Sequence, residues 1–174
     1  GNIDDALSIL YKTEDGSFKR TAFHQWAGDL DSRPFPARHL MNNALYKRPD
    51  TDEPMATIQT ARGCPSACVF CLTPIISGTC VRFRSPQNVL DEMLECYDVH
   101  GIKSFFFKAD TFTIDPKWVK EMCELIINSK MHGNITFTAN SRVNPLSKET
   151  LKLMKDAGCF MVAFGFESGS DEML

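Results

Sequence analysis

From residue 56 onward the chain alternates short apolar segments with segments of helical periodicity, and this alternation limits its fold more than any other feature. The strand candidates are residues 56–60, 103–107, 135–139 and 160–164. The helix candidates open on capping residues at Ser85, Asp115 and Ser147, and the first and last of them close at Gly101 and Gly158. Strands and helices in alternation predict βα units with right-handed crossovers and a parallel sheet.

The predicted fold class is therefore α/β, with parallel βα units over residues 56–174. A chain of 174 residues with 43% hydrophobic residues can bury one core of ordinary size. Residues 1–55 show no independent core, because segments 6–11 and 18–23 predict only a β-hairpin and the rest is rich in proline and charge. We divide the chain into a linker and hairpin segment, 1–55, and an α/β unit, 56–174, in which a last helix opens at Ser170.

Charge and hydropathy exclude several classes of protein. The formal net charge is −3, and lysine and arginine are scattered among acidic residues, so no nucleic-acid surface is evident. The first residues are acidic and lack the pattern of a signal peptide. No apolar run approaches the ~20 residues that span a bilayer. These features favour a cytoplasmic protein with no membrane partner.

Polar or metal-ligating residues follow all four predicted strands. Cys64 follows the first strand, Asp110 the second, Arg142 the third and Glu167 the fourth. Each turn alone is explained by the usual polarity of such connections. Because the carboxyl ends of parallel strands meet at one edge of the sheet, the four together favour a joint site there.

The turn after the first strand, residues 61–84, is much longer than the usual βα loop of about 2–6 residues. It contains Cys64, Cys68 and Cys71, which are separated by three and by two residues. Three thiolates this close can surround one soft-metal centre and leave a coordination position open. The alternative is that Cys80, nine residues after the third cysteine, is the fourth ligand of a zinc or electron-transfer site.

The three cysteines at this spacing, with the aromatic Phe70 just before the third, resemble the signature of the radical S-adenosylmethionine superfamily. Residues 62–65, 82–92 and 165–170, and the linker 29–37, are similar to the branch whose members carry a cobalamin-binding domain before the barrel. The resemblance covers roughly residues 29–174 and implies the first half of a TIM-like partial barrel, with the upstream domain absent.

The resemblance implies a metal centre and a reaction. Cys64, Cys68 and Cys71 would each hold one iron of a [4Fe–4S] cluster, and the fourth iron would bind S-adenosylmethionine. An electron from the cluster would cleave this cofactor to methionine and a 5′-deoxyadenosyl radical, which abstracts hydrogen from the substrate. No separate catalytic residue is identified.

The resemblance also assigns residues to the cofactor, namely Phe70, Asp110, Arg142, Glu167 and Ser168. The backbone near Phe70 would lie along the adenine, Asp110 and Arg142 would serve the amino-acid end, and Glu167 would serve the ribose hydroxyls or the amino group. Three of these residues also have a plain structural alternative. Asp110 could cap its own turn, Arg142 could form a surface ion pair, and Glu167 could belong to a helix start.

The predicted enzyme would act on an unidentified small-molecule substrate and would need an external electron donor. Cobalamin-dependent methyl transfer and cyclisation both fit. One alternative is a methylthiotransferase-like enzyme that modifies RNA or protein, and another is the non-catalytic module with four cysteines. The apolar strand 160–164 would be an open parallel edge, which predicts self-association.

Overall fold

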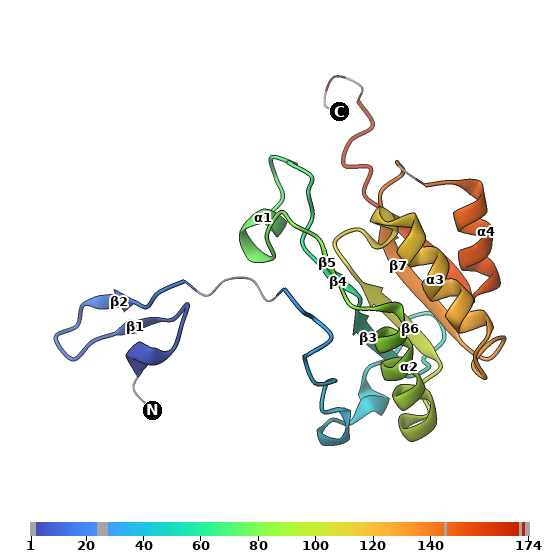
Figure 1. The fold of residues 1–174 in the computed structure, drawn as a ribbon, viewed down its shortest axis with the longest axis horizontal. Helices are drawn as coiled ribbons and strands as arrows, with labels where there is room; N and C mark the ends of the chain where they lie inside the picture. Colours follow the sequence, from blue (N-terminus) through green and yellow to red (C-terminus); the bar gives the residue numbers. More distant parts are fainter. Residues whose placement is uncertain (1–2, 24–27, 145, 171, 173–174) are drawn as a thin grey trace.

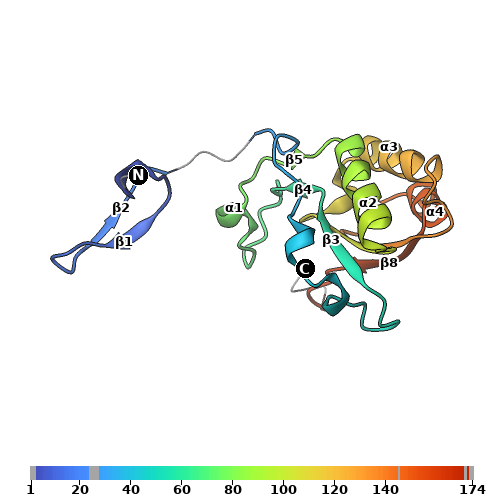
Figure 2. The same cartoon turned by 90° about the horizontal axis from the view of Figure 1, so that it is seen from below.

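The computed structural model describes residues 3–23, 28–144, 146–170 and 172. Its centre is a parallel four-stranded sheet in the order β3-β6-β7-β8, which confirms the predicted α/β class. The strands are β3 (Met55–Gln59), β6 (Ser104–Lys108), β7 (Thr136–Ser141) and β8 (Cys159–Phe164). The helices α2 (Pro86–His100), α3 (Pro116–Ile127) and α4 (Lys148–Asp156) cover one face of the sheet (Figure 1, Figure 2).

The predicted helix ends are confirmed, because each is set by a local side chain or glycine. Ser85 accepts a hydrogen bond from the backbone N–H of Asn88, and Ser147 accepts one from Thr150. Asp115 accepts from two backbone N–H groups of the first turn of α3. These bonds satisfy donors that have no partner within the helix. The helix predicted to open at Ser170 includes Asp171, which lies outside the described residues.

The core lies between the sheet and its helices. The side chains of Phe105, Phe107 and Phe137 point from β6 and β7 into this layer and are fully buried. The rings of Phe107 and Phe137 lie 4.7 Å apart, and Phe112 stacks on Phe107 at 5.4 Å. Burying a side chain of this kind stabilises the fold by about 1.5–3 kcal/mol. The core therefore fixes β6 and β7 at the centre of the sheet.

The other face of the sheet is covered at its amino end by the loop that precedes β3. The guanidinium of Arg48 lies 3.9 Å from the centre of the Phe160 ring and donates a hydrogen bond of 3.0 Å to the hydroxyl of Thr136. Asp50 pairs with the same guanidinium at 2.5 Å. The loop of residues 48–54 thus folds under the sheet and buries an arginine there.

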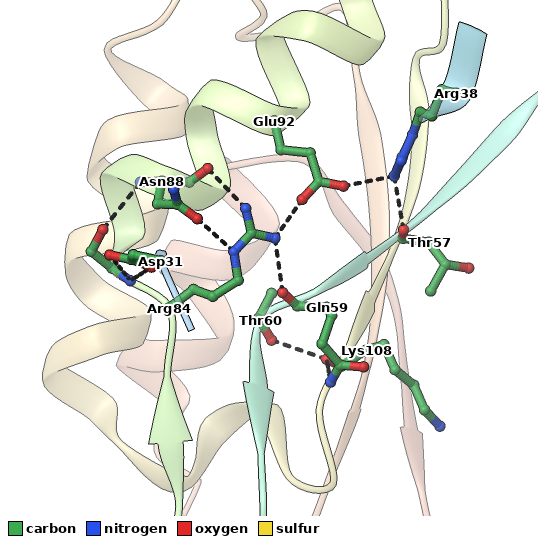
Figure 3. Close-up of polar contacts among 10 residues, drawn as sticks. Asp31, Arg38, Thr57, Gln59, Thr60, Arg84, Asn88, Glu92 and Lys108 are labelled. Carbon is green, nitrogen blue, oxygen red and sulfur yellow. Dashed lines mark hydrogen bonds and ion pairs between the residues drawn. The ribbon is translucent and has the colours of Figure 1, made fainter. Parts of the chain in front are cut away.

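The segment 29–40, which contains the predicted linker 29–37, is attached to the edge strand β3 by buried charges (Figure 3). Glu92 of α2 lies between Arg38, at 2.7 Å, and Arg84, with which it also pairs. Each arginine also donates to a β3 carbonyl at 3.0 Å, Arg38 to Thr57 and Arg84 to Gln59. These side chains cover the outer edge of β3, so β8 is the edge of the described sheet that has no such cover.

Residues before the linker form the predicted hairpin, in which β1 (Leu10–Lys12) pairs antiparallel with β2 (Phe18–Arg20). Short 3-10 turns lie at Ile3–Asp5, Arg38–Leu40, Asn43–Leu45 and Phe112–Ile114. The boundary at residue 55 between the linker segment and the α/β unit stays a prediction. Among the described helices, none combines the length and hydropathy that a membrane span requires.

Candidate metal and cofactor site

A cavity of about 640 Å³ opens at the carboxyl ends of the parallel strands, where the sequence predicted a joint site. Its wall comes from the long turn after β3 and from the turns after β6, β7 and β8. The predicted residues on this wall are Cys64, Cys68, Phe70, Cys71, Asp110, Arg142 and Glu167. Ser168 is not part of the wall, and its hydroxyl accepts a hydrogen bond from the backbone N–H of Ser170 at 3.1 Å.

The turn that carries the cysteines has more structure than the sequence indicated. Its two ends pair as β4 (Ala61–Arg62) and β5 (Arg82–Phe83), and one helical turn, α1 (Thr73–Ile76), follows the third cysteine. Gly63 has φ +94°, and a Cβ there would lie 2.2 Å from the carbonyl oxygen of Cys80. Only glycine tolerates this backbone conformation and this close approach. The segment from Gly78 to Cys80 therefore supports the start of the cysteine loop.

Two of the three cavity thiols accept hydrogen bonds. The backbone N–H of Thr73 donates to the Cys71 sulfur at 3.4 Å, and hydrogen bonding by Thr73 lowers the pKa of Cys71. The Arg142 guanidinium donates to the Cys68 sulfur at 3.4 Å, and this contact raises the pKa of Arg142. Because the thiolate is the form that binds metal, the contact at Cys71 favours ligation by this cysteine. Cys64 is buried.

The donor set suits an iron–sulfur cluster. Cysteine thiolates are the usual ligands of such clusters, and the cavity volume falls in the range of about 300–1,000 Å³ that is common for ligand sites. In the part of the chain that is described, no three His, Cys, Asp or Glu side chains already surround a single metal position. The side chain of Cys80 is exposed and does not line the cavity, so the geometry does not support it as a fourth ligand.

Asp110 contacts the cysteine turn from the neighbouring strand end. One carboxylate oxygen accepts from the backbone N–H of Gly63 at 3.0 Å, and the other accepts from the hydroxyl of Thr73 at 3.2 Å. These bonds join Asp110 to the cysteine turn rather than to Thr111 and its own turn, where a local cap would have placed them. Sequence reasoning missed Thr73, although a threonine before Pro74 at a helix start was a usable signal.

The fourth strand ends in an irregular turn beside the cavity. Glu167 has φ +58°, a left-handed conformation that is uncommon for a residue other than glycine. Its carboxylate lies over Gly165, where a Cβ would come within 2.5 Å of it. Phe70 and Phe166 are exposed at the rim. The ligand roles assigned to Cys64, Cys68 and Cys71 stay predictions, as do the cofactor roles assigned to Phe70, Asp110, Arg142, Glu167 and Ser168.

Comparison with known proteins identifies the family. The model of the Radical SAM superfamily matches residues 58–174. An uncharacterized methyltransferase of Pyrococcus horikoshii is 33% identical over 97% of this chain and 36% of its own length. Cytidylyl-2-hydroxyethylphosphonate methyltransferase of Streptomyces wedmorensis is 33% identical over 85% of this chain and 29% of its own length. The chain thus spans about a third of these relatives.

A solved structure shows the same fold. It is the radical S-adenosylmethionine methyltransferase TsrM of Kitasatospora setae, solved with cobalamin and a [4Fe–4S] cluster bound. The TM-score is 0.69 at 19% identity, over 95% of this chain and 34% of that one. The parallel βα units are accordingly part of a TIM-like partial barrel. Together with the cysteine motif on the cavity wall, these matches show that the chain belongs to the Radical SAM superfamily.

Proposed function

We propose that the protein is a radical S-adenosylmethionine enzyme that uses a [4Fe–4S] cluster. The observation that carries this proposal is the placement of Cys64, Cys68 and Cys71 on one cavity wall at the carboxyl ends of the strands. These cysteines would hold the cluster. When bound, the cluster supplies the electron that cleaves S-adenosylmethionine to methionine and a 5′-deoxyadenosyl radical. The match of the family model to residues 58–174 supports the same conclusion.

The other residues of the cavity would bind and orient the cofactor. Arg142 offers a fixed cation with a planar set of donors, which suits a carboxylate group. Glu167 offers an acceptor for hydroxyl or amino groups. Both residues line the same cavity as the cysteines, although they follow different strands. The exposed ring of Phe70, at the rim, would shield the adenine from water.

Methyl transfer is the reaction class that we propose, because the relatives named above are methyltransferases. The cobalamin bound in the TsrM structure makes cobalamin the second cofactor that we propose, held by residues outside this chain. We propose a small-molecule substrate and an external one-electron donor. A reducing cytoplasm suits this chemistry, and none of the seven cysteines, all of which lie in the described residues, forms a disulfide.

The test is electron paramagnetic resonance of the full-length protein, reconstituted anaerobically with iron and sulfide and then reduced. We expect a [4Fe–4S]⁺ signal that changes when S-adenosylmethionine is added, together with release of 5′-deoxyadenosine. Cys68→Ser should remove the signal. A wild-type cluster that does not respond to the cofactor, or zinc in place of iron, would contradict the proposal.

The open edge of β8 supports a separate proposal, self-association of a preparation that contains only these residues. Phe160 and Met161 are 44% and 50% exposed on this strand. An unpaired apolar strand offers backbone donors and acceptors to another chain. Sedimentation velocity at rising protein concentration should show a growing dimer or larger species. A single monomeric species over a hundredfold range of about 1–100 µM, the range in which exposed edges associate, would contradict it.

A further inference from the structure

The shape of the cysteine loop depends on contacts at its two ends. Between Cys64 and Cys71 the backbone does not form the regular hydrogen bonds of a helix or a strand. The N–H of Cys64 donates to Gly78 at 3.2 Å, and that of Cys71 donates to Cys68 at 3.0 Å. A segment with so few internal bonds is held by what its flanking residues contact. Those contacts therefore decide how far apart the three sulfur atoms lie.

Asp110 contacts both flanks of this loop. Gly63, which directly precedes the first cysteine, donates its N–H to one carboxylate oxygen at 3.0 Å. Thr73, two residues after the third cysteine, donates its hydroxyl to the other oxygen at 3.2 Å. Strand pairing makes this arrangement possible, because Gln59 is paired with Lys108 and the two strands leave the sheet side by side.

The contact continues through Thr73 to a predicted metal ligand. While the hydroxyl of Thr73 donates to Asp110, its backbone N–H donates to the Cys71 sulfur at 3.4 Å. Groups that hold or hydrogen-bond a metal ligand orient it, and hydrogen bonds to cysteine sulfur tune the potential of a cluster. Both oxygens of Asp110 are thus engaged by the loop that carries the cysteines.

We infer that Asp110 is a positioning residue, which clamps the cysteine loop through Gly63 and Thr73. This inference rests on the proposed function and differs from the role at the amino-acid end of the cofactor that the family resemblance implied. The clamp sets the spacing of the sulfur atoms before a cluster binds. Its loss should weaken cluster binding without removing the response of a bound cluster to S-adenosylmethionine.

The experiment compares variants of the full-length protein, reconstituted with iron and sulfide under anaerobic conditions. Asp110→Ala removes both acceptor oxygens, and Thr73→Val removes the hydroxyl while it keeps the N–H. Thr73→Ser restores the hydroxyl. Asp115→Asn is the control for the loss of an aspartate charge outside the cavity, because asparagine caps a helix as well as aspartate does and Asp115 accepts hydrogen bonds from the start of α3.

Bound iron is measured against a rising concentration of a ferrous chelator, and the reduced cluster is examined by electron paramagnetic resonance with and without S-adenosylmethionine. We expect Asp110→Ala and Thr73→Val each to hold the cluster about 10- to 100-fold more weakly, the range for residues that support metal ligands. The double variant should hold the cluster about as weakly as Asp110→Ala alone, because Asp110→Ala already removes the contact with Thr73. Thr73→Ser and Asp115→Asn should match the wild type.

Three results would overturn the inference. The first is an Asp110→Ala cluster of normal affinity whose signal no longer responds to S-adenosylmethionine, since this would place Asp110 on the cofactor. The second is normal affinity and a normal response in both variants. The third is a loss of affinity in Asp110→Ala alone, because the clamp requires Thr73. A wild-type protein that binds no such cluster would instead contradict the proposed function itself.

Discussion

Glu92 is the single carboxylate between two buried arginines, so its charge should contribute strongly to stability. Its side chain is 2% exposed, and those of Arg38 and Arg84 are 7% and 9% exposed. Glu92→Gln keeps the size of the side chain and removes its charge. The variant would leave two guanidinium groups close together in the interior, with carbonyl and amide oxygens and the Phe35 ring as described partners.

The magnitude follows from the burial of this group. Removing one partner of a buried ion pair costs about 3–5 kcal/mol, because the remaining charge stays without compensation. Native domains are stable by about 5–15 kcal/mol in total. Glu92→Gln should therefore remove about a fifth or more of the stability. Arg38→Met should cost less, because the remaining Glu92 and Arg84 still form a neutral pair.

Urea unfolding followed by far-UV circular dichroism measures these differences. The control is Asp98→Asn, which breaks the exposed pair of Asp98 with Lys130, a contact expected to contribute about 0–1 kcal/mol. A loss in Glu92→Gln no larger than that of the control would refute the reasoning. A larger loss of unfolding free energy in Arg38→Met than in Glu92→Gln would also refute the reasoning, because the charges predict the larger loss in Glu92→Gln.

Three further predictions concern the thiols and the cysteine loop. Cys80→Ser should leave the reduced cluster signal unchanged, since the side chain of Cys80 is exposed and outside the cavity. Loss of the signal would support the alternative of a metal site with four cysteine ligands. Gly63→Ala should destabilise the apoprotein by about 1–3 kcal/mol and reduce bound iron, whereas Gly28→Ala, with open space around its Cβ, should do neither. Burial raises the pKa of Cys123 from 9.0 to about 12, so its contribution to stability is present below pH 9 and is lost as the pH rises from 9 towards 12. Above pH 9 the unfolding free energy of Cys123→Ala should fall less steeply with pH than that of the wild type, and the two slopes should differ by about 1.4 kcal/mol per pH unit. Equal slopes in the two proteins would count against burial of this thiol.

Local signals accounted for the elements that the sequence predicted correctly. The caps at Ser85, Asp115 and Ser147 act on backbone groups within three residues, so a short stretch of sequence contains the whole interaction. The alternation of strands and helices then determined the parallel order of the sheet. The cysteine motif is likewise local, and its position after the first strand placed it at the cavity.

Contacts between distant residues were not predictable in the same way. Glu92 and Arg38 are separated by 54 positions, and Arg48 and Thr136 by 88. Each of these residues looks like an ordinary surface charge or strand residue in the sequence. Only the fold brings them together, and burial then changes what their charge does. For the same reason the sequence indicated a plain loop where β4 and β5 pair across the ends of the cysteine turn.

The buried charges and the candidate site are coupled through Arg84, which ends the cysteine turn. Its backbone N–H donates to the carbonyl of Thr60 at 2.9 Å, and Thr60 is the residue that precedes this turn. Its guanidinium donates to the Gln59 carbonyl and pairs with Glu92. Glu92 thus helps to hold together the two ends of a loop whose closure costs conformational entropy. Because the cysteines lie within that loop, a variant at Glu92 should weaken cluster binding as well as stability, although Glu92 does not line the cavity.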